Sequence, residues 1–390
     1  MRKSLILLAV AGALWLVPGA FAADPPGVKG IGASLSPSGE VPRPNAPKGA
    51  GGLFSAILTS DGTASTIAWS LDVSGLSGAA SGAHIHFGAK GKAGDIALEL
   101  CGPCTSGARG KAKLDQKVLD AINAGEAYVN VHTTANPPGE IRGQIAPARA
   151  VAAALTSAGE VPPAQNVPAG AKGAFKAIVI AQPDRAVIAW TLTQSGLSGG
   201  AQAAHIHLGA AGVAGGVALP LCQPCGASVS GRRSIKASLA AAIGSVPMYV
   251  NVHTAANPGG EVRGQLVHAT LGVAAWKTAL GTIVTDDRGM TLYNFKADQG
   301  IQSACYNQCA VFWPPAFVVG TPVAGTGTTA SLLGITQRTD GTTMLTYKGQ
   351  PLYGFLRDTQ SGMTTGQGSR GFGAPWWVID SATGNEIAGA

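Results

Sequence analysis

YVNVHTTANPPGEIRGQ, residues 128–144, and YVNVHTAANPGGEVRGQ, residues 249–265, are two nearly identical stretches 121 positions apart. In each, apolar residues alternate with polar or small ones, which is the period of a half-buried β-strand. GAHIHFG at 82–88 and AAHIHLG at 203–209 stand at the same spacing, as do Trp69 and Trp190. A constant displacement over this length indicates an internal duplication. The sequence therefore predicts two copies of one β module.

The rest of each copy follows the same pattern. Ile67, Trp69, Leu71 and Val73 alternate with small or polar residues, and Gly-Leu-Ser-Gly at 75–78 reads as a turn. One short helix is expected over 114–123, closed by Gly125. We predict an all-β protein with two tandem Greek-key β-sandwich or barrel domains and a smaller β-rich C-terminal domain.

The first residues predict export. Arg2 and Lys3 precede an apolar run over 5–17, and Ala20-Phe21-Ala22 fits the cleavage pattern of a secretory signal. No comparable apolar run follows, so we expect no transmembrane segment after cleavage and a secreted or periplasmic location. The expected domains are a signal peptide at 1–22, modules at 28–147 and 148–270, and a third domain at 276–390.

Composition narrows the choice of partner. Charged residues are only 12% of the chain, and the formal net charge of +7 includes Arg2 and Lys3. The remaining positive residues are scattered, with Arg232-Arg233 the only adjacent basic pair outside the signal. A nucleic-acid surface needs clustered positive charge, so a nucleic-acid partner is not expected.

Histidines are placed twice in the same way. In Ala83-His84-Ile85-His86 the two rings share one strand face, and in 128–132 the residues Tyr128, Asn130 and His132 lie opposite the valines. Neutral imidazole is a preferred ligand of copper and zinc. The expected metal ligands are His84, His86 and His132 in the first copy and His205, His207 and His253 in the second.

Polar residues on the same strand faces complete each expected site. They are Asn130, Glu140 and Arg142 in the first copy and Asn251, Glu261 and Arg263 in the second. An alternative interpretation needs no metal: the histidines form a hydrogen-bonded polar face, and Glu140 with Arg142 forms a structural ion pair.

The six cysteines fall in three close pairs, Cys101 with Cys104, Cys222 with Cys225, and Cys305 with Cys309. Cys-Gly-Pro-Cys at 101–104 matches the thioredoxin tetrapeptide, but Thr-Ser-Gly follows it where thioredoxin chemistry requires a helix. We expect local structural disulfides, with thiolate ligation of a soft metal as the alternative.

The order G-E-V-P, A-H-I-H, C-x-x-C, Y-V-N-V-H-T and N-P-x-G-E-I/V-R-G-Q resembles the CHRD domain, first described in chordin, over about 30–147 and 150–268. The resemblance implies an all-β domain of bacterial exported proteins without a well-established activity. His-Ile-His-Phe-Gly is also similar to a metal-binding strand of copper–zinc superoxide dismutases, although the spacing differs.

From about Gly281 the sequence changes character. It contains two Leu-Tyr-x-Phe stretches, the first followed by Asp298 and the second by Asp358, together with Cys305-x3-Cys309 and Trp376-Trp377. Over about 276–382 this pattern resembles a bacterial secreted repeat family of unknown function. We expect its aromatic residues to pack in the core rather than form a ligand platform.

Three functions follow from these patterns. The first is a non-catalytic metal-binding protein, the second a structural or interaction protein with an unidentified protein or envelope partner, and the third an oxidoreductase related to the dismutases. No nucleophile–base–acid set stands out, so we assign no catalytic residue and no organic cofactor.

Overall fold

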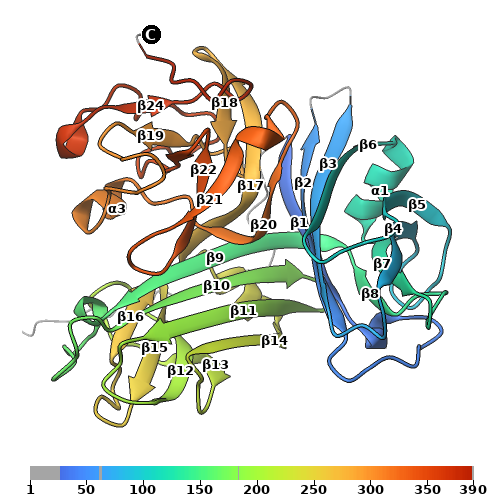
Figure 1. The fold of residues 1–390 in the computed structure, drawn as a ribbon, viewed down its shortest axis with the longest axis horizontal. Coiled ribbons are helices and arrows are strands. Elements are labelled where there is room, and N and C mark those ends of the chain that lie inside the picture. Colours follow the sequence, from blue (N-terminus) through green and yellow to red (C-terminus); the bar gives the residue numbers. More distant parts are fainter. Residues whose placement is uncertain (1–26, 61–63, 183, 389–390) are drawn as a thin grey trace, which may run out of the picture.

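The structure is a computed structural model and describes residues 27–60, 64–182 and 184–388 (Figure 1). The expected signal peptide lies outside the described residues. The described part contains 24 strands and only three short α-helices, so the all-β prediction is confirmed. None of the described helices is long and apolar enough to cross a membrane.

Module 1 is a sandwich of two antiparallel sheets. The first sheet has the order β1 (Val28–Leu35), β2 (Gly51–Ser60), β3 (Ser65–Ser74) and β6 (Ala108–Leu114). The second has the order β5 (Ile96–Cys101), β4 (Ala80–Phe87), β7 (Ala127–Thr133) and β8 (Ile141–Gln144).

Module 2 repeats this arrangement strand for strand. Its first sheet has the order β9 (Ala146–Thr156), β10 (Lys172–Ala181), β11 (Arg185–Ser195) and β14 (Ser228–Lys236). Its second sheet has the order β13 (Val217–Cys222), β12 (Ala201–Leu208), β15 (Met248–Thr254) and β16 (Val262–Gln265). The duplication in sequence is therefore a duplication of the sandwich.

The core of each module lies between its two sheets. In module 1, Phe54 and Leu71 of the first sheet pack against Ile85 and Val129 of the second, and all four are fully buried. Because side chains alternate along a strand, this packing turns the histidines of β4 and β7 to the outer face of the second sheet.

The predicted helix forms with shifted bounds. It is α1 (Gln116–Ala124), which starts two residues later than expected because Leu114 still pairs with Ser65 at the end of β6. Gly125 closes it with φ of 71°, the left-handed conformation that glycine adopts without strain. Its counterpart in module 2 is the shorter α2 (Ala237–Ala242).

No loop separates the three parts of the chain. Strand β9 pairs with β1 of module 1 at its first residues and with β10 along the rest of its length. Strand β17 (Val267–Thr278) pairs first with β9 and then with β18 (Gly281–Thr285) and β20 (Val318–Ala324) of the third domain. Figure 1 shows β9 and β17 passing from one part to the next.

The third domain is built on two matching halves. Its other elements are β19 (Tyr293–Phe295), α3 (Gln308–Phe312), β21 (Leu333–Gln337), β22 (Thr343–Tyr347), β23 (Gln350–Pro351) and β24 (Trp376–Val378). The backbones of Tyr293 and Tyr353 bond to each other, and the Tyr293 hydroxyl donates to Asp358 while the Tyr353 hydroxyl donates to Asp298. Each Leu-Tyr-x-Phe stretch therefore uses the aspartate that follows the other one.

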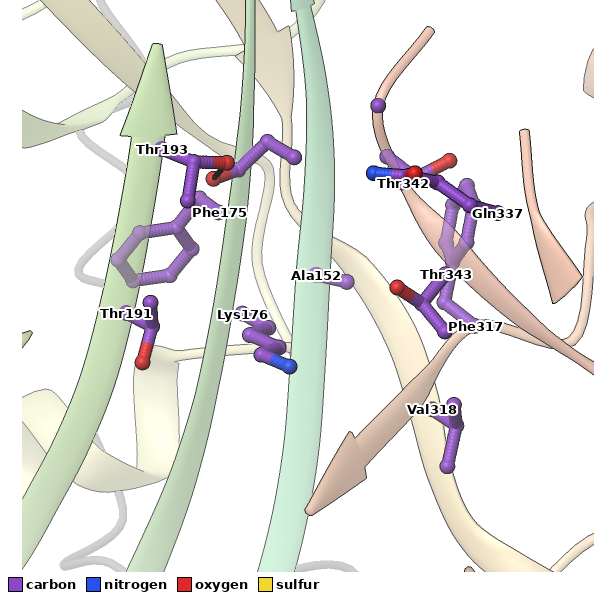
Figure 2. A pocket seen from close by; sticks show the side chains of 12 residues that line it. Ala152, Phe175, Lys176, Thr191, Thr193, Phe317, Val318, Gln337, Thr342 and Thr343 are labelled. Carbon is purple, nitrogen blue, oxygen red and sulfur yellow. Dashed lines mark hydrogen bonds between the residues drawn. The ribbon is translucent and has the colours of Figure 1, made fainter. Parts of the chain in front are cut away.

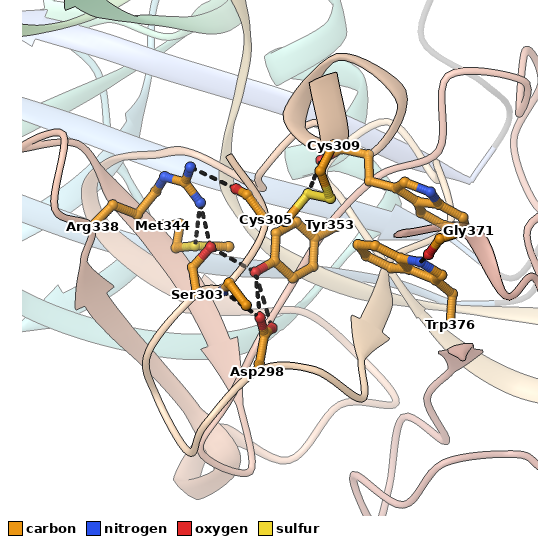
Figure 3. The surroundings of a disulfide bond; sticks show 11 residues. Asp298, Ser303, Cys305, Cys309, Arg338, Met344, Tyr353, Gly371 and Trp376 are labelled. Carbon is orange, nitrogen blue, oxygen red and sulfur yellow. Dashed lines mark hydrogen bonds between the residues drawn. A yellow bond between two sulfur atoms is a disulfide. The ribbon is translucent and has the colours of Figure 1, made fainter. Parts of the chain in front are cut away.

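The aromatic residues of this domain form its core, as expected. Trp313 stacks on Trp376 with ring centres 3.9 Å apart, and Phe355 and Phe295 extend the stack on either side. Both tryptophans are at most 1% exposed, so they offer no platform to a ligand. Figure 3 shows Trp376 and Tyr353 beside the Cys305–Cys309 disulfide.

Candidate metal centre

The three histidines of module 1 converge on one place. His84 and His86 project from β4, and His132 projects from the neighbouring strand β7. One nitrogen can be chosen from each ring so that all three lie within 4.8 Å of one another. His205, His207 and His253 of module 2 meet the same condition. We call these groups histidine cluster 1 and histidine cluster 2.

Backbone carbonyls fix the orientation of two rings in each cluster. Nδ1 of His86 lies 3.0 Å from the Gly94 carbonyl oxygen, and Nδ1 of His132 lies 2.9 Å from that of Pro137. A carbonyl oxygen can only accept, so each Nδ1 carries the proton and each Nε2 presents a lone pair. Nε2 of His86 is buried without a hydrogen-bond partner.

The third ring completes the group. Nδ1 of His84 lies 3.0 Å from Nε2 of His132, so without a metal it donates to that lone pair. Two ligand nitrogens of a tetrahedral zinc ion stand about 3.3 Å apart, since each Zn–N bond is about 2.0–2.1 Å. The distance between Nδ1 of His84 and Nε2 of His132 is therefore already close to the distance between two nitrogens that bind one ion.

Burial favours the neutral form of two of these rings. It lowers the pKa of His84, with the neighbouring His132 and His86 acting in the same direction and Glu99 opposing them. Burial likewise lowers the pKa of His86, with the His132 and Arg142 charges acting in the same direction while the Gly94 hydrogen bond and Asp95 oppose them. A neutral imidazole is the form that binds a metal, so proton competition is weak near pH 7.

Histidine cluster 2 repeats the details. Nδ1 of His207 bonds the Gly215 carbonyl, Nδ1 of His253 bonds that of Pro258, and His205 lies 3.1 Å from His253. Nε2 of His207 is again buried and without a partner. The arrangement, including the unpartnered buried lone pair, is therefore kept in both copies.

The two clusters differ in charge. His84 pairs across the sheet with Glu99, and Asp95 lies close enough to raise the pKa of His86. The corresponding positions of module 2, 121 residues further on, are Pro220 and Gly216. Cluster 1 therefore has two nearby carboxylates that cluster 2 lacks.

The structure separates Glu140 from Arg142, so the ion pair that the alternative interpretation assumed is wrong. Glu140 precedes β8 and accepts hydrogen bonds from Ser77, Thr133 and Asn136, away from the arginine. Arg142 donates instead to the carbonyls of Ala89 and Lys92. Glu261 and Arg263 of module 2 separate in the same way.

Arg142 reaches the histidines through an aromatic ring. Its guanidinium carbon lies 3.3 Å from the centre of the Tyr128 ring, and Tyr128 stacks on His86. Asn130 stands between Tyr128 and His132 on β7 and donates to the Pro138 carbonyl, in the same loop that anchors His132. These residues therefore hold the rings and the loop in place.

The cysteines form three local disulfides, Cys101–Cys104, Cys222–Cys225 and Cys305–Cys309. The first two follow β5 and β13 and lead into turns, not into a helix that could lower a thiol pKa. With their sulfurs bonded to each other, they have no thiolate to offer a metal.

Sequence reasoning missed a third group of possible ligands, His268, Asp286 and Asp287, where β17 meets the third domain. Its carboxylates are already occupied, because Asp286 accepts from Arg288 and Asp287 accepts from His268 and the Leu271 amide. We interpret it as a structural ion-pair group. A hollow of about 160 Å³ between module 2 and the third domain is lined by threonines, phenylalanines and Lys176 and contains no such group (Figure 2).

Fold and site together define a tandem β-sandwich protein with one outward-facing histidine cluster per module. The CHRD domain model matches residues 31–145 and 151–266, and a model described as a secreted repeat of unknown function matches residues 274–317 and 334–380. The chain belongs to the CHRD domain family, with secreted repeats at its C-terminal end. No curated protein and no solved structure matches it.

Proposed function

We propose that this protein is a non-catalytic binder of copper or zinc with one three-histidine site in each CHRD module. The observation that carries the proposal is the buried, unpartnered Nε2 of His86 and of His207. A buried nitrogen without a hydrogen bond costs stability, and a metal ion satisfies it. Anchored Nδ1 atoms on the other side of the rings are the usual support of such ligands.

The ligand set suits copper and zinc among the common metals. Imidazole nitrogens favour these ions over calcium or magnesium, which prefer oxygen. Three protein ligands leave a fourth position for water. Since cluster 1 has the two additional carboxylates, we expect it to bind a dication more tightly than cluster 2.

Metal content of the purified full chain tests the proposal. The wild-type protein should bind two equivalents of zinc or copper in two affinity classes, measured by calorimetric titration and elemental analysis. Joint replacement of His84, His86 and His132 by Ala should leave one equivalent and remove the tighter class. His268→Ala is the matched control and should retain two equivalents, because His268 is the one histidine outside the clusters.

Two results would contradict this function. The first is a wild-type protein that stays free of metal, and the second is a triple variant that still binds two equivalents with a native circular dichroism spectrum. Either result would favour the structural or interaction protein, in which the histidines only form a polar face.

We also propose that the protein works outside the cytoplasm, in the periplasm or beyond it. The signal pattern at 1–22, the three disulfides and the secreted family at the C-terminal end support this location. An oxidising compartment is where local disulfides persist.

A further inference from the structure

A cleft of about 440 Å³ lies where module 2 meets module 1. Its lining carries five cationic side chains and no carboxylate: Lys90, Arg142, Arg185, Arg232 and Arg233. Serine, glycine, glutamine and valine make up the rest. We propose that this inter-module basic cleft binds a small multivalent oxyanion, a molecule carrying two or more phosphate, sulfate or carboxylate groups.

The positive charge of the cleft is only partly offset, because the buried Glu40 interacts with Arg142 but no carboxylate lines the cleft itself. Among the described residues, none of the five cations forms an ion pair with Asp or Glu. The hydrogen bonds that their side chains donate go to uncharged acceptors, such as the Ser234 hydroxyl for Arg185 and the Pro220 carbonyl for Arg233. Five like charges around one hollow repel one another, and a bound anion removes that repulsion.

Two of the arginines are held in place by the fold. Arg142 is only 3% exposed and is fixed by its stacking on Tyr128. Arg232 of β14 donates to the carbonyls of Leu35 and Gly52, which belong to module 1. A site with prearranged cations loses less entropy when a ligand binds. Arg185 and Arg233 are exposed beside them, where Arg185 bonds the Ser234 hydroxyl and Arg233 the Pro220 carbonyl.

The cleft belongs to the junction and not to the repeated module. Positions 121 residues from Arg185 and Arg233 are Ala64 and Ala112, and the position matching Lys90 is Ala211. Arg142 and Arg232 match the cations Arg263 and Lys111, so Lys90, Arg185 and Arg233 are the three positive charges that the duplicate surface lacks. The module fold therefore does not require a cation at these three positions, and a bound anion gives a physical reason for placing them at the junction.

The donors favour oxyanions over nucleic acid. Four of the five cations are arginines, whose forked N–H groups match the oxygens of phosphate, sulfate and carboxylate. Single-stranded nucleic acid binds on aromatic side chains that stack with its bases, and no aromatic residue lines the cleft. The hollow also has the size of a small molecule rather than the length of a polymer groove.

Calorimetric titration of the metal-free full chain tests the proposal at low salt, about 50 mM. The probes are inorganic tripolyphosphate and sucrose octasulfate, which separate a phosphate source from a sulfated sugar, with sucrose as the neutral control. Each arginine contact to an oxyanion is a charge-assisted hydrogen bond, so Arg185→Ser with Arg233→Ser should weaken binding about tenfold or more. Lys113→Ser with Lys277→Ser removes the same charge from exposed positions outside the cleft and should change affinity little.

Tight binding of either probe that depends on Arg185 and Arg233 supports the proposed oxyanion site. The probe that binds more tightly shows whether the site prefers a phosphate compound or a sulfated sugar. Absence of binding by both probes overturns it. Equal weakening by the cleft pair and the control pair also overturns it, because the attraction would then be the net charge of the whole protein. Metal binding by the histidine clusters is measured separately, so its failure and this one are distinguishable.

Discussion

Replacing Glu40 with Gln should stabilise the folded protein above pH 7 and have little effect at pH 5. Glu40 belongs to the Gly-Glu-Val-Pro stretch that both modules share, and its side chain is buried with one carboxylate oxygen lacking a hydrogen-bond partner. Burial raises the pKa of Glu40 from 4.5 to about 7, although the Arg142 charge and a backbone hydrogen bond at Val41 oppose it.

The sign follows from proton linkage. The folded protein holds the Glu40 proton more tightly than the unfolded chain, so this residue's contribution to stability is fully present below pH 4.5 and is lost as the pH rises through 7. A pKa change from 4.5 to about 7 corresponds to about 3 kcal/mol. Since the Glu40 side chain is buried, we expect at least about 2 kcal/mol of this energy to be measurable.

Urea unfolding followed by tryptophan fluorescence at pH 5 and pH 8.5 measures the effect. Glu40→Gln should be more stable than the wild type by about 2 kcal/mol at pH 8.5 and by less than about 1 kcal/mol at pH 5. Glu160→Gln should behave alike, because burial also raises the pKa of Glu160 to about 7.

Glu140→Gln is the control of opposite sign. Burial would raise the pKa of Glu140, but hydrogen bonds from Ser77, Thr133 and Asn136 outweigh it and lower the pKa. Its contribution is present above pH 4.5, so this variant should be less stable than the wild type at pH 8.5. Parallel stability profiles for the wild type and Glu40→Gln would refute the reasoning.

Two further predictions concern the metal and the compartment. Because the pKa values of His84 and His86 are lowered, zinc affinity should hold from about pH 7.5 to about 6.5 and fall toward pH 5.5, and a titration that finds equal binding at pH 7.5 and 5.5 would count against imidazole ligands. The intact mass of the exported protein should match a chain that begins near Ala23 with all six cysteines oxidised, and a retained Met1 or alkylatable thiols would contradict the assigned compartment.

Local rules were enough to predict which residues share a face. Alternation along a strand has a period of two, so it assigned His84 and His86 to one side and Ile85 to the core before any tertiary contact was known. The turn at Lys348-Gly349 is also a local feature, because a two-residue hairpin turn needs positive φ angles and favours glycine. The two residues have φ of 51° and 73°.

Features that depend on distant segments were not predictable. The carbonyls of Gly94 and Pro137 orient the histidine rings, but both belong to loops whose path over the sheet no local pattern encodes. Proximity in sequence also suggested a wrong contact. Glu140 lies two residues from Arg142, yet the two side chains form hydrogen bonds with different partners. The basic cleft was missed for the opposite reason, since its cations are scattered in sequence and meet only where the modules touch.

The shared strands make the unit of duplication differ from the unit of folding. A cut between residues 147 and 148 would pass through β9, which pairs with β1 on one side of the cut and with β10 on the other. Each half would then expose an unpaired strand edge, the kind of surface through which proteins aggregate. A fragment that carries one histidine cluster therefore has to retain β9 or β17 intact, and the repeat unit read from the sequence is not a fragment that can be excised cleanly.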